Sequence, residues 1–121
     1  MLGEDSGLEV AALGGAPGIE TARWADGRHV ERILEALNGV ADRRARYVCE
    51  LVALAADGRE LRGTGTLGGR IAHEPRGTAG FGFDPVFVPD GEDRAVAELG
   101  DEWKSEHSHR ARAARALCEQ L

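Results

Sequence analysis

Two segments show the hydrophobic spacing of amphipathic helices, with apolar residues at positions i, i+3, i+4 and i+7. We expect the first helix to begin at Asp26 as its N-cap and to stop at Asn38-Gly39. We expect the second to be capped by Ser108, whose hydroxyl can accept from a free backbone N–H. The apolar positions are Val30, Ile33, Leu34 and Leu37 in the first helix and Ala114, Leu117, Cys118 and Leu121 in the second.

A β-hairpin is predicted in the middle of the chain. Residues 46–56 alternate in a period of two with both faces largely apolar, which favours a central strand. Asp57-Gly58 is a strong two-residue turn signal, and the return strand runs over residues 60–66. We expect residues 67–73 to continue that strand after a bend at Gly68-Gly69. A further short strand is predicted at residues 86–88.

The first 27 residues are rich in glycine, and the pattern predicts loops there, with a strand end at residues 8–10 and a helical turn at residues 19–24. The order helix, hairpin, strand, helix predicts an α/β (α+β) fold in which helices flank a mixed or antiparallel sheet. The length of 121 residues is a little under one average domain, so we expect a single domain over residues 1–121.

The composition is globular, with 42% hydrophobic and 30% charged residues. A net charge of −6 gives no overall attraction to nucleic acid or to an anionic membrane. No apolar run approaches the roughly 20 residues that span a bilayer, and the N-terminus does not resemble a signal peptide. Cys49 and Cys118 lack CxxC spacing, so we expect reduced, buried thiols in a cytoplasmic protein.

Three short segments could carry chemistry, and the first is Glu4-Asp5-Ser6-Gly7. It places two carboxylates, a hydroxyl and a glycine next to one another. Such a segment is either a solvated turn or part of a magnesium site. Mg²⁺ typically takes one or two carboxylates and completes its coordination with water and substrate phosphate.

The second segment is Gly80-Phe81-Gly82-Phe83-Asp84-Pro85. With Phe87 it holds three of the six aromatic residues of the chain. Rings that alternate with glycine suit stacking on a nucleobase, worth roughly 1–3 kcal/mol per base. The alternative is that the rings fill the core while the glycines form a bulge.

The third segment combines Lys104, the one lysine among fifteen basic residues, with Ser108-His109-Arg110. A helix N-terminus with these side chains forms a pocket rich in donors and poor in acceptors, which suits a phosphate or a ring carbonyl. An ordinary capped helix with solvated charges is the alternative. A metal pair of His107 and His109 is disfavoured because no third ligand stands nearby.

Taken together, these segments resemble the inosine triphosphate pyrophosphatases, also called XTP/dITP diphosphatases. No segment is specific alone, but they occur in the order of that family and cover nearly the whole chain. The matching stretches are residues 5–10, 12–19, 22–24, 34–37, 43–49, 68–71, 80–85 and 97–99, followed by Lys104 and Ser108-His109-Arg110.

The resemblance implies Mg²⁺-dependent hydrolysis of ITP, dITP and XTP to the monophosphate and pyrophosphate. It implies an elongated two-lobed α/β protein that forms a homodimer. It assigns Asp5 as proton acceptor and metal ligand, and Ser6 as a substrate contact. The remaining substrate-binding residues that it implies are Phe81, Gly82, Phe83, Asp84, Lys104, His109 and Arg110.

Base selectivity has a physical explanation in this assignment. Deaminated purines carry the acceptor O6 where adenine carries an amino donor. A pocket of Lys, protonated His, Arg and backbone N–H groups would satisfy O6, whereas the adenine amino group would leave those donors unpaired.

The chain also departs from the family pattern. It lacks the strand and the Thr/Ser-Gly-Asn-x-x-Lys loop that hold the phosphates at the start of family members, so we expect a domain truncated at its N-terminus. Glu4 and Ala11 stand where aspartates are common. Two alternatives to the enzyme therefore stay open: an inactive or weakly active fragment that binds purine nucleotides or dimerises, and a plain structural protein.

Overall fold

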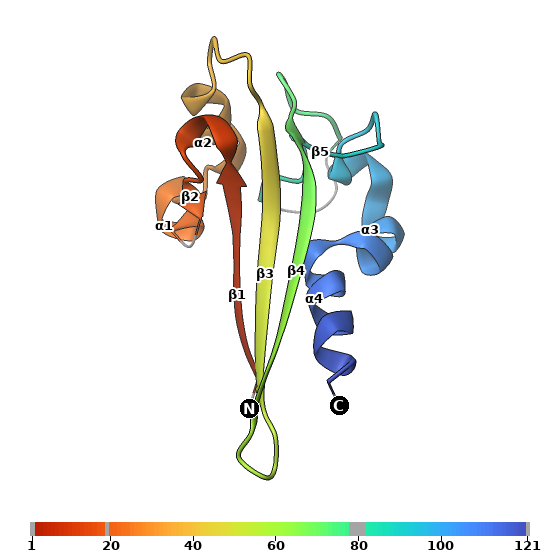
Figure 1. The fold of residues 1–121 in the computed structure, drawn as a ribbon. Helices are drawn as coiled ribbons and strands as arrows, with labels where there is room; N and C mark the ends of the chain where they lie inside the picture. The colour runs from red at the N-terminus through yellow and green to blue at the C-terminus, as the bar shows by residue number, and fades with distance from the viewer. Residues whose placement is uncertain (1, 19, 78–81, 121) are drawn as a thin grey trace.

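The computed structural model describes residues 2–18, 20–77 and 82–120. Five antiparallel strands form one sheet in the order β2-β1-β3-β4-β5 (Figure 1). Helices lie beside this sheet, so the predicted fold class is confirmed, and its sheet is antiparallel. The strands are β1 (Leu2–Val10), β2 (Pro17–Gly18), β3 (Arg44–Leu54), β4 (Glu60–Ile71) and β5 (Phe87–Pro89).

The predicted loop at the start of the chain is wrong for residues 2–7, because the strand end expected at residues 8–10 belongs to a longer strand, β1, that begins at Leu2. β1 pairs with β3 along its whole length, from Leu2 opposite Ala53 to Val10 opposite Ala45. Glycines and a polar Glu4-Asp5-Ser6 run hide the alternation in the sequence. The pairing with β3 therefore overrides the weak local preference.

The predicted hairpin is confirmed, and β3 is central in the sheet, between β1 and β4. The turn is closed by a hydrogen bond from Gly58 N–H to Ala55 C=O, and Gly58 has the positive φ of 89° that a glycine accepts readily. β4 continues through Gly68-Gly69 without a break, and the ring of Phe87 lies in the space that a Gly69 side chain would fill.

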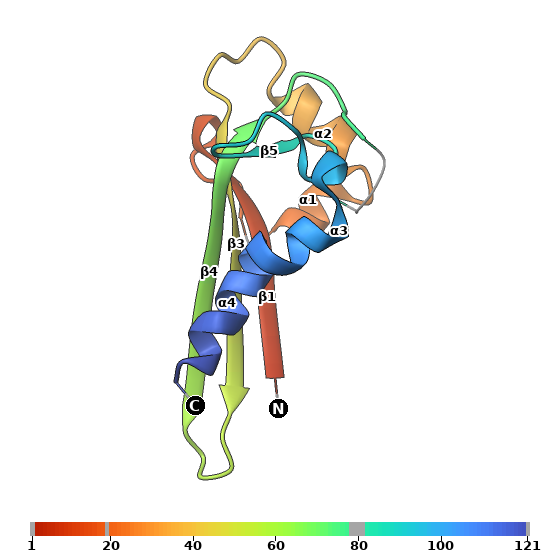
Figure 2. The ribbon, with the colours of Figure 1, turned by 90° about the vertical axis from the view of Figure 1, so that its right-hand side faces the viewer.

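One face of the sheet carries the core. Buried side chains on β1, β3 and β4 point to this face, and Figure 2 shows α4 lying across its lower half. The opposite face carries exposed or half-exposed side chains, including Asp5, Val48, Val52 and Thr64. The side that a residue occupies follows from the alternation along each strand, so β1 presents Glu4, Ser6 and Leu8 to the core face.

The helices agree with the sequence in part. The helical turn expected at residues 19–24 is α1 (Thr21–Ala25), and α2 (His29–Ala36) follows it. Asp26 does not cap α2 as expected, because it ends α1 in a left-handed conformation with φ 48°. The sequence did not predict α3 (Val96–His107), which Gly100 interrupts with non-helical angles. Ser108 caps α4 (His109–Cys118) as expected, accepting from Ala111 N–H at 3.1 Å.

Two glycines bring α4 unusually close to the sheet. Gly63 and Gly65 on β4 face the helix, and a Cβ at either position would overlap backbone atoms of α4. At Gly65 these are atoms of His109, Arg112 and Ala113. The absence of side chains at these two positions therefore lets α4 pack directly against the backbone of β4.

The core has two parts on the same face. The larger lies under α1, α2 and β5 and includes Ile33, Leu37 and Phe87, and the smaller lies under α4 and includes Cys49 and Leu117. Both cysteines are free, but only Cys49 is buried, so the expectation of a buried thiol is wrong for Cys118. No helix in the described ranges is long and apolar enough to cross a bilayer.

Candidate functional site

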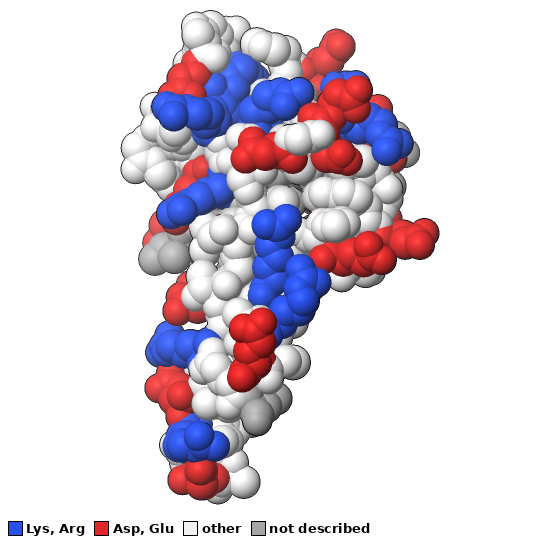
Figure 3. All heavy atoms as spheres, turned by 45° about the vertical axis from the view of Figure 1, so that its right-hand side comes forward, with Lys and Arg blue, Asp and Glu red and all other residues white. Residues whose placement is uncertain are grey.

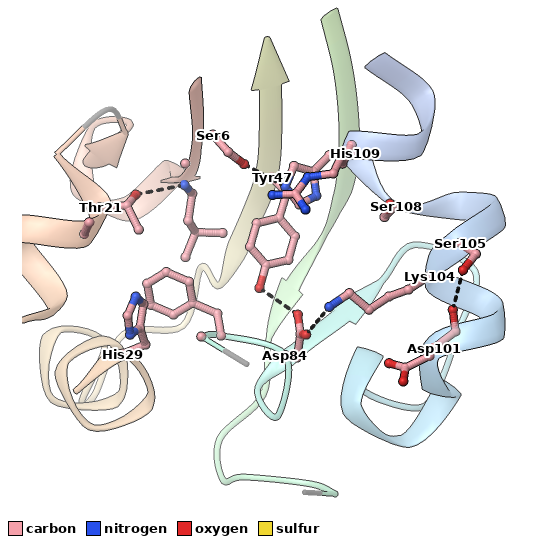
Figure 4. A pocket seen from close by; sticks show the side chains of 16 residues that line it. Ser6, Thr21, His29, Tyr47, Asp84, Asp101, Lys104, Ser105, Ser108 and His109 are labelled. Atoms are coloured by element: carbon pink, nitrogen blue, oxygen red, sulfur yellow. Dashed lines mark hydrogen bonds and ion pairs between the residues drawn. The ribbon is translucent and has the colours of Figure 1, made fainter. Parts of the chain in front are cut away.

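A pocket of about 510 Å³ opens between the core face of the sheet and the helices. Strands β1 and β3, helices α1 to α4 and the loop before β5 all contribute to its lining (Figure 4). Seven of the predicted substrate residues line it: Ser6, Gly82, Phe83, Asp84, Lys104, His109 and Arg110. The pocket thus collects residues from both ends of the chain.

The side chain of Arg110 is exposed at the rim of the pocket. The pocket lining excludes Asp5. Phe81, the remaining predicted substrate residue, lies outside the described residues. The grouping of the other residues agrees with the predicted base site, and their roles stay predictions.

An ion pair between a half-buried lysine and a buried aspartate lines the pocket. Lys104 Nζ on α3 lies 2.7 Å from Asp84 Oδ2, and the Asp84 side chain is 7% exposed. Tyr47 on β3 donates a long hydrogen bond of 3.4 Å to Asp84 Oδ1. The pocket was expected to be poor in acceptors, and this expectation is wrong because Asp84 places a carboxylate beside the ammonium group.

His109, the first residue of α4, is hydrogen-bonded to Ser6 through a 2.9 Å contact between Nε2 and Oγ. Burial, and to a smaller extent the neighbouring positive charge of Arg110, lower the pKa of His109 to about 4. The expected imidazolium is therefore a neutral imidazole at neutral pH.

The tautomer of His109 follows from its other nitrogen. Nδ1 is buried, and no described residue offers it a hydrogen-bond partner. An orphaned buried N–H is rarer in proteins than an under-satisfied acceptor, so the proton belongs on Nε2. His109 then donates to Ser6 Oγ, which leaves the Ser6 hydroxyl proton to donate to an acceptor on a ligand.

Arg110 is paired in this structure. Its guanidinium contacts Glu4 Oε1 through both Nε, at 2.8 Å, and Nη2, at 2.5 Å. Glu4 and Ser6 occupy the same face of β1, so this pair lies beside the contact between Ser6 and His109. All of these charges are balanced locally, and Figure 3 shows acidic and basic side chains interspersed over the face that it draws.

The aromatic segment contributes to both the core and the pocket. Phe83 is 3% exposed and belongs to the larger core cluster, and it also lines the pocket. His29 on α2 lies edge-on to Phe83, with ring centroids 4.9 Å apart. The two readings of this segment, core packing and base contact, are thus compatible at Phe83.

Asp5 lies on the opposite face of the sheet. It pairs with Glu50 across the strands β1 and β3, whereas Ser6 pairs with Cys49 on the core face. Its side chain is exposed.

Sequence reasoning missed several residues of the pocket, among them Tyr47, His29 and Thr21. Tyr47 was assigned only to a strand, His29 only to a helix, and Thr21 to no role. Thr21 Oγ accepts from Leu8 N–H at 3.0 Å and donates to Gly18 C=O at 2.6 Å, which fastens α1 to β1. The sequence left both faces of this strand apolar, so only the fold shows that Tyr47 lies between Asp84 and His109.

Comparison with known proteins gives consistent matches. The model of the Ham1 family matches residues 1–120. The dITP/XTP pyrophosphatase of Gloeobacter violaceus is 50% identical over 119 residues, which cover 96% of this chain and 60% of that protein. The dITP/XTP pyrophosphatase of Opitutus terrae is 48% identical over 126 residues, with 98% and 62% covered.

Solved structures show the same fold. The Ham1 protein of Staphylococcus aureus superposes with a TM-score of 0.92 at 39% identity, covering 99% of this chain and 65% of that one. The HAM1 protein of Coxiella burnetii gives a TM-score of 0.89 at 37% identity, with 99% and 66% covered. The chain spans about 60% of the length of the curated relatives described above. The resemblance noted in the sequence is confirmed, and the chain belongs to the Ham1 family.

Proposed function

We propose that the pocket binds the base of a deaminated purine nucleotide, and that the protein hydrolyses ITP, dITP or XTP to the monophosphate and pyrophosphate. The names of the relatives, dITP/XTP pyrophosphatases, support the reaction class. The observation that carries the base assignment is the ion pair of Asp84 and Lys104 in the pocket lining.

This pair offers an acceptor and a donor side by side. Hypoxanthine and xanthine present a donor at N1–H next to an acceptor at O6, whereas adenine presents the reverse pattern, with an acceptor at N1 and an amino donor. A carboxylate oxygen of Asp84 suits N1–H, and the ammonium of Lys104 suits O6. Adenine would leave both charged groups facing the wrong partner, which is costly in a site of this kind.

The outer edge of β1 offers a path from the pocket to Asp5. Leu8 N–H and Val10 N–H point outward, to Thr21 Oγ and to Ala16 C=O. The alternation along the strand then points Ser6 N–H outward as well. β2 pairs with β1 only at Leu8 and Glu9, so no described strand covers the edge at Ser6. Phosphates that cross this edge would meet the Ser6 N–H and then the carboxylate of Asp5.

The residues present fit Mg²⁺ as an ion shared with the substrate. No group of three His, Cys, Asp or Glu side chains in the described residues could hold a metal by itself. Mg²⁺ commonly binds through one or two carboxylates plus substrate phosphates, and Asp5 is an exposed carboxylate at the proposed phosphate path. Asp5 would hold the ion, which supplies charge neutralisation at the phosphates.

The proposed reaction is attack of water on the α-phosphorus. The new P–O bond forms as the bond to the bridging oxygen of the β-phosphate breaks, and pyrophosphate leaves. Asp5 accepts the proton of the attacking water. Because phosphoryl transfer needs little covalent chemistry from the protein, the main tasks of the pocket residues are to hold the base and to orient the phosphates.

The test compares pyrophosphate release from ITP and ATP with Mg²⁺, together with calorimetric affinities for IMP and AMP. We expect ITP and IMP to be preferred, and Lys104→Met to erode both preferences. Arg59→Met, which removes a cation in the hairpin turn outside the pocket, is the matched control and should preserve them. Equal affinity of the unaltered chain for IMP and AMP would overturn the base assignment.

A second candidate is a nucleotide-binding module without hydrolytic activity. The position of Asp5 on the face opposite the pocket favours it, because binding of the base needs no contribution from that residue. Base-selective binding without pyrophosphate release would identify this alternative. The homodimer and the cytoplasmic location remain proposals that rest on the resemblance and, for the location, on the free cysteines.

A further inference from the structure

Tyr47 lies at the centre of the pocket residues and has no role in the preceding assignments. It projects from β3 toward the core face, and 9% of the residue is exposed. Asp84, Phe83, Phe87 and His109 all contact it through its hydroxyl or its ring. Figure 4 shows it between Asp84 and His109.

The hydroxyl of Tyr47 acts on Asp84. Burial raises the pKa of Tyr47 well above its ordinary value, and the nearby Asp84 raises it further, so the phenol keeps its proton. It therefore donates to Oδ1 of Asp84, while Lys104 contacts Oδ2. Two different residues thus hold the two oxygens, which fixes the plane of the carboxylate.

The ring of Tyr47 acts on His109. The two rings are stacked, with centroids 4.7 Å apart and planes 15° apart. Phe87 supports the Tyr47 ring from the core, with centroids 4.4 Å apart. Rotation of the imidazole is restricted by this stack, which keeps Nε2 directed at Ser6 Oγ.

We propose that Tyr47 is a positioning residue for two polar side chains of the pocket. Its hydroxyl orients Asp84, and its ring orients His109. The residue contacts neither phosphate nor metal in this assignment. Its effect on nucleotide selectivity rests on the proposed function of the pocket, whereas its effect on the two side chains does not.

Two variants test the effect of the hydroxyl and the effect of the ring separately. Tyr47→Phe removes the hydroxyl and keeps the stacked ring, and we expect it to lower the affinity for IMP by about fivefold while leaving that for AMP unchanged. Tyr47→Leu removes both contacts. In this variant the ring-proton resonances of His109, which the Tyr47 ring current displaces, should return toward their ordinary positions, and in Tyr47→Phe they should stay displaced.

Loss of stability alone must be distinguished from loss of positioning. Ile33→Val removes a buried methyl group from the same core cluster, outside the pocket lining. It should lower the melting temperature without changing the ratio of IMP to AMP affinity or the His109 resonances.

The outcomes separate this inference from the proposed function. If the unaltered chain prefers IMP and Tyr47→Phe keeps the full preference, the action of the hydroxyl on Asp84 is overturned. If the His109 resonances do not respond to Tyr47→Leu, the action of the ring is overturned. If the unaltered chain shows no preference for IMP, the proposed function fails, and the NMR comparison still decides whether Tyr47 orients His109.

Discussion

Ser6 and His109 are separated by 103 positions in the sequence and joined by a 2.9 Å hydrogen bond between Oγ and Nε2. The bond connects strand β1 to the first turn of α4. It holds the two ends of the chain together at the pocket.

Protonation of His109 makes stability depend on pH. Its pKa is about 4 in the folded chain, against about 6.5 in an unfolded one, so the unfolded state binds more protons between these values. The free energy of unfolding should therefore fall as the pH drops from 6.5 toward 4. His109→Gln should show a shallower fall of melting temperature over this window. His73→Gln, at an exposed position, should follow the unaltered chain, and parallel curves for all three proteins would contradict the expectation.

Gly65→Ala tests the close approach of α4 to the sheet. A methyl group there would overlap backbone atoms of the helix, so we expect a loss of at least about 2 kcal/mol in the free energy of unfolding and weaker IMP binding. Gly3→Ala is the matched control on β1, where a methyl group meets open space. Urea unfolding followed by circular dichroism compares the two variants. Equal stability of both would show that α4 does not pack tightly against Gly65.

Asp5→Asn should separate base binding from hydrolysis. Because Asp5 faces away from the pocket, the affinity for IMP should be unchanged. Any Mg²⁺-dependent release of pyrophosphate from ITP should be lost, since the proposed proton acceptor and metal ligand is gone. Calorimetry and a pyrophosphate assay on the same preparation measure both. Unchanged turnover would remove Asp5 from the mechanism.

The isolated chain of 121 residues should bind IMP nearly as tightly as ITP. The cations of the pocket are engaged by acids, Lys104 by Asp84 and Arg110 by Glu4, and His109 is neutral. The additional phosphates of ITP therefore gain little attraction, and turnover of ITP should be slow. Calorimetry with and without Mg²⁺ measures the ratio. A large preference for ITP would show a phosphate site in this chain that the pairing conceals.

The sequence predicted the elements whose patterns are local. The hairpin has alternating strands and an Asp-Gly turn, and α4 has a serine cap, so both were found. Most of β1 was missed because its strand character comes from pairing with β3, whose partner residues lie 35 or more positions away. α3 was missed because Gly100 breaks its periodicity.

The sequence predicted which residues belong to the candidate site but not how they contact one another. The residue types at Asp84, Lys104 and His109 were found from short segments and from the resemblance. Their pairing could not be predicted, because the contact between Lys104 and Asp84 and the low pKa of His109 arise from burial in the fold. Tyr47 looked like an ordinary core residue for the same reason.

Because α4 packs closely against Gly63 and Gly65, the geometry of the pocket depends on β4, a strand that does not line it. Any side chain at these positions would lift the helix and carry His109 away from Ser6, although no polar group of the pocket had been altered. Substitutions in β4 can therefore act on nucleotide preference indirectly, by changing the spacing between two backbones. A search for selectivity variants that is confined to the pocket lining would overlook them.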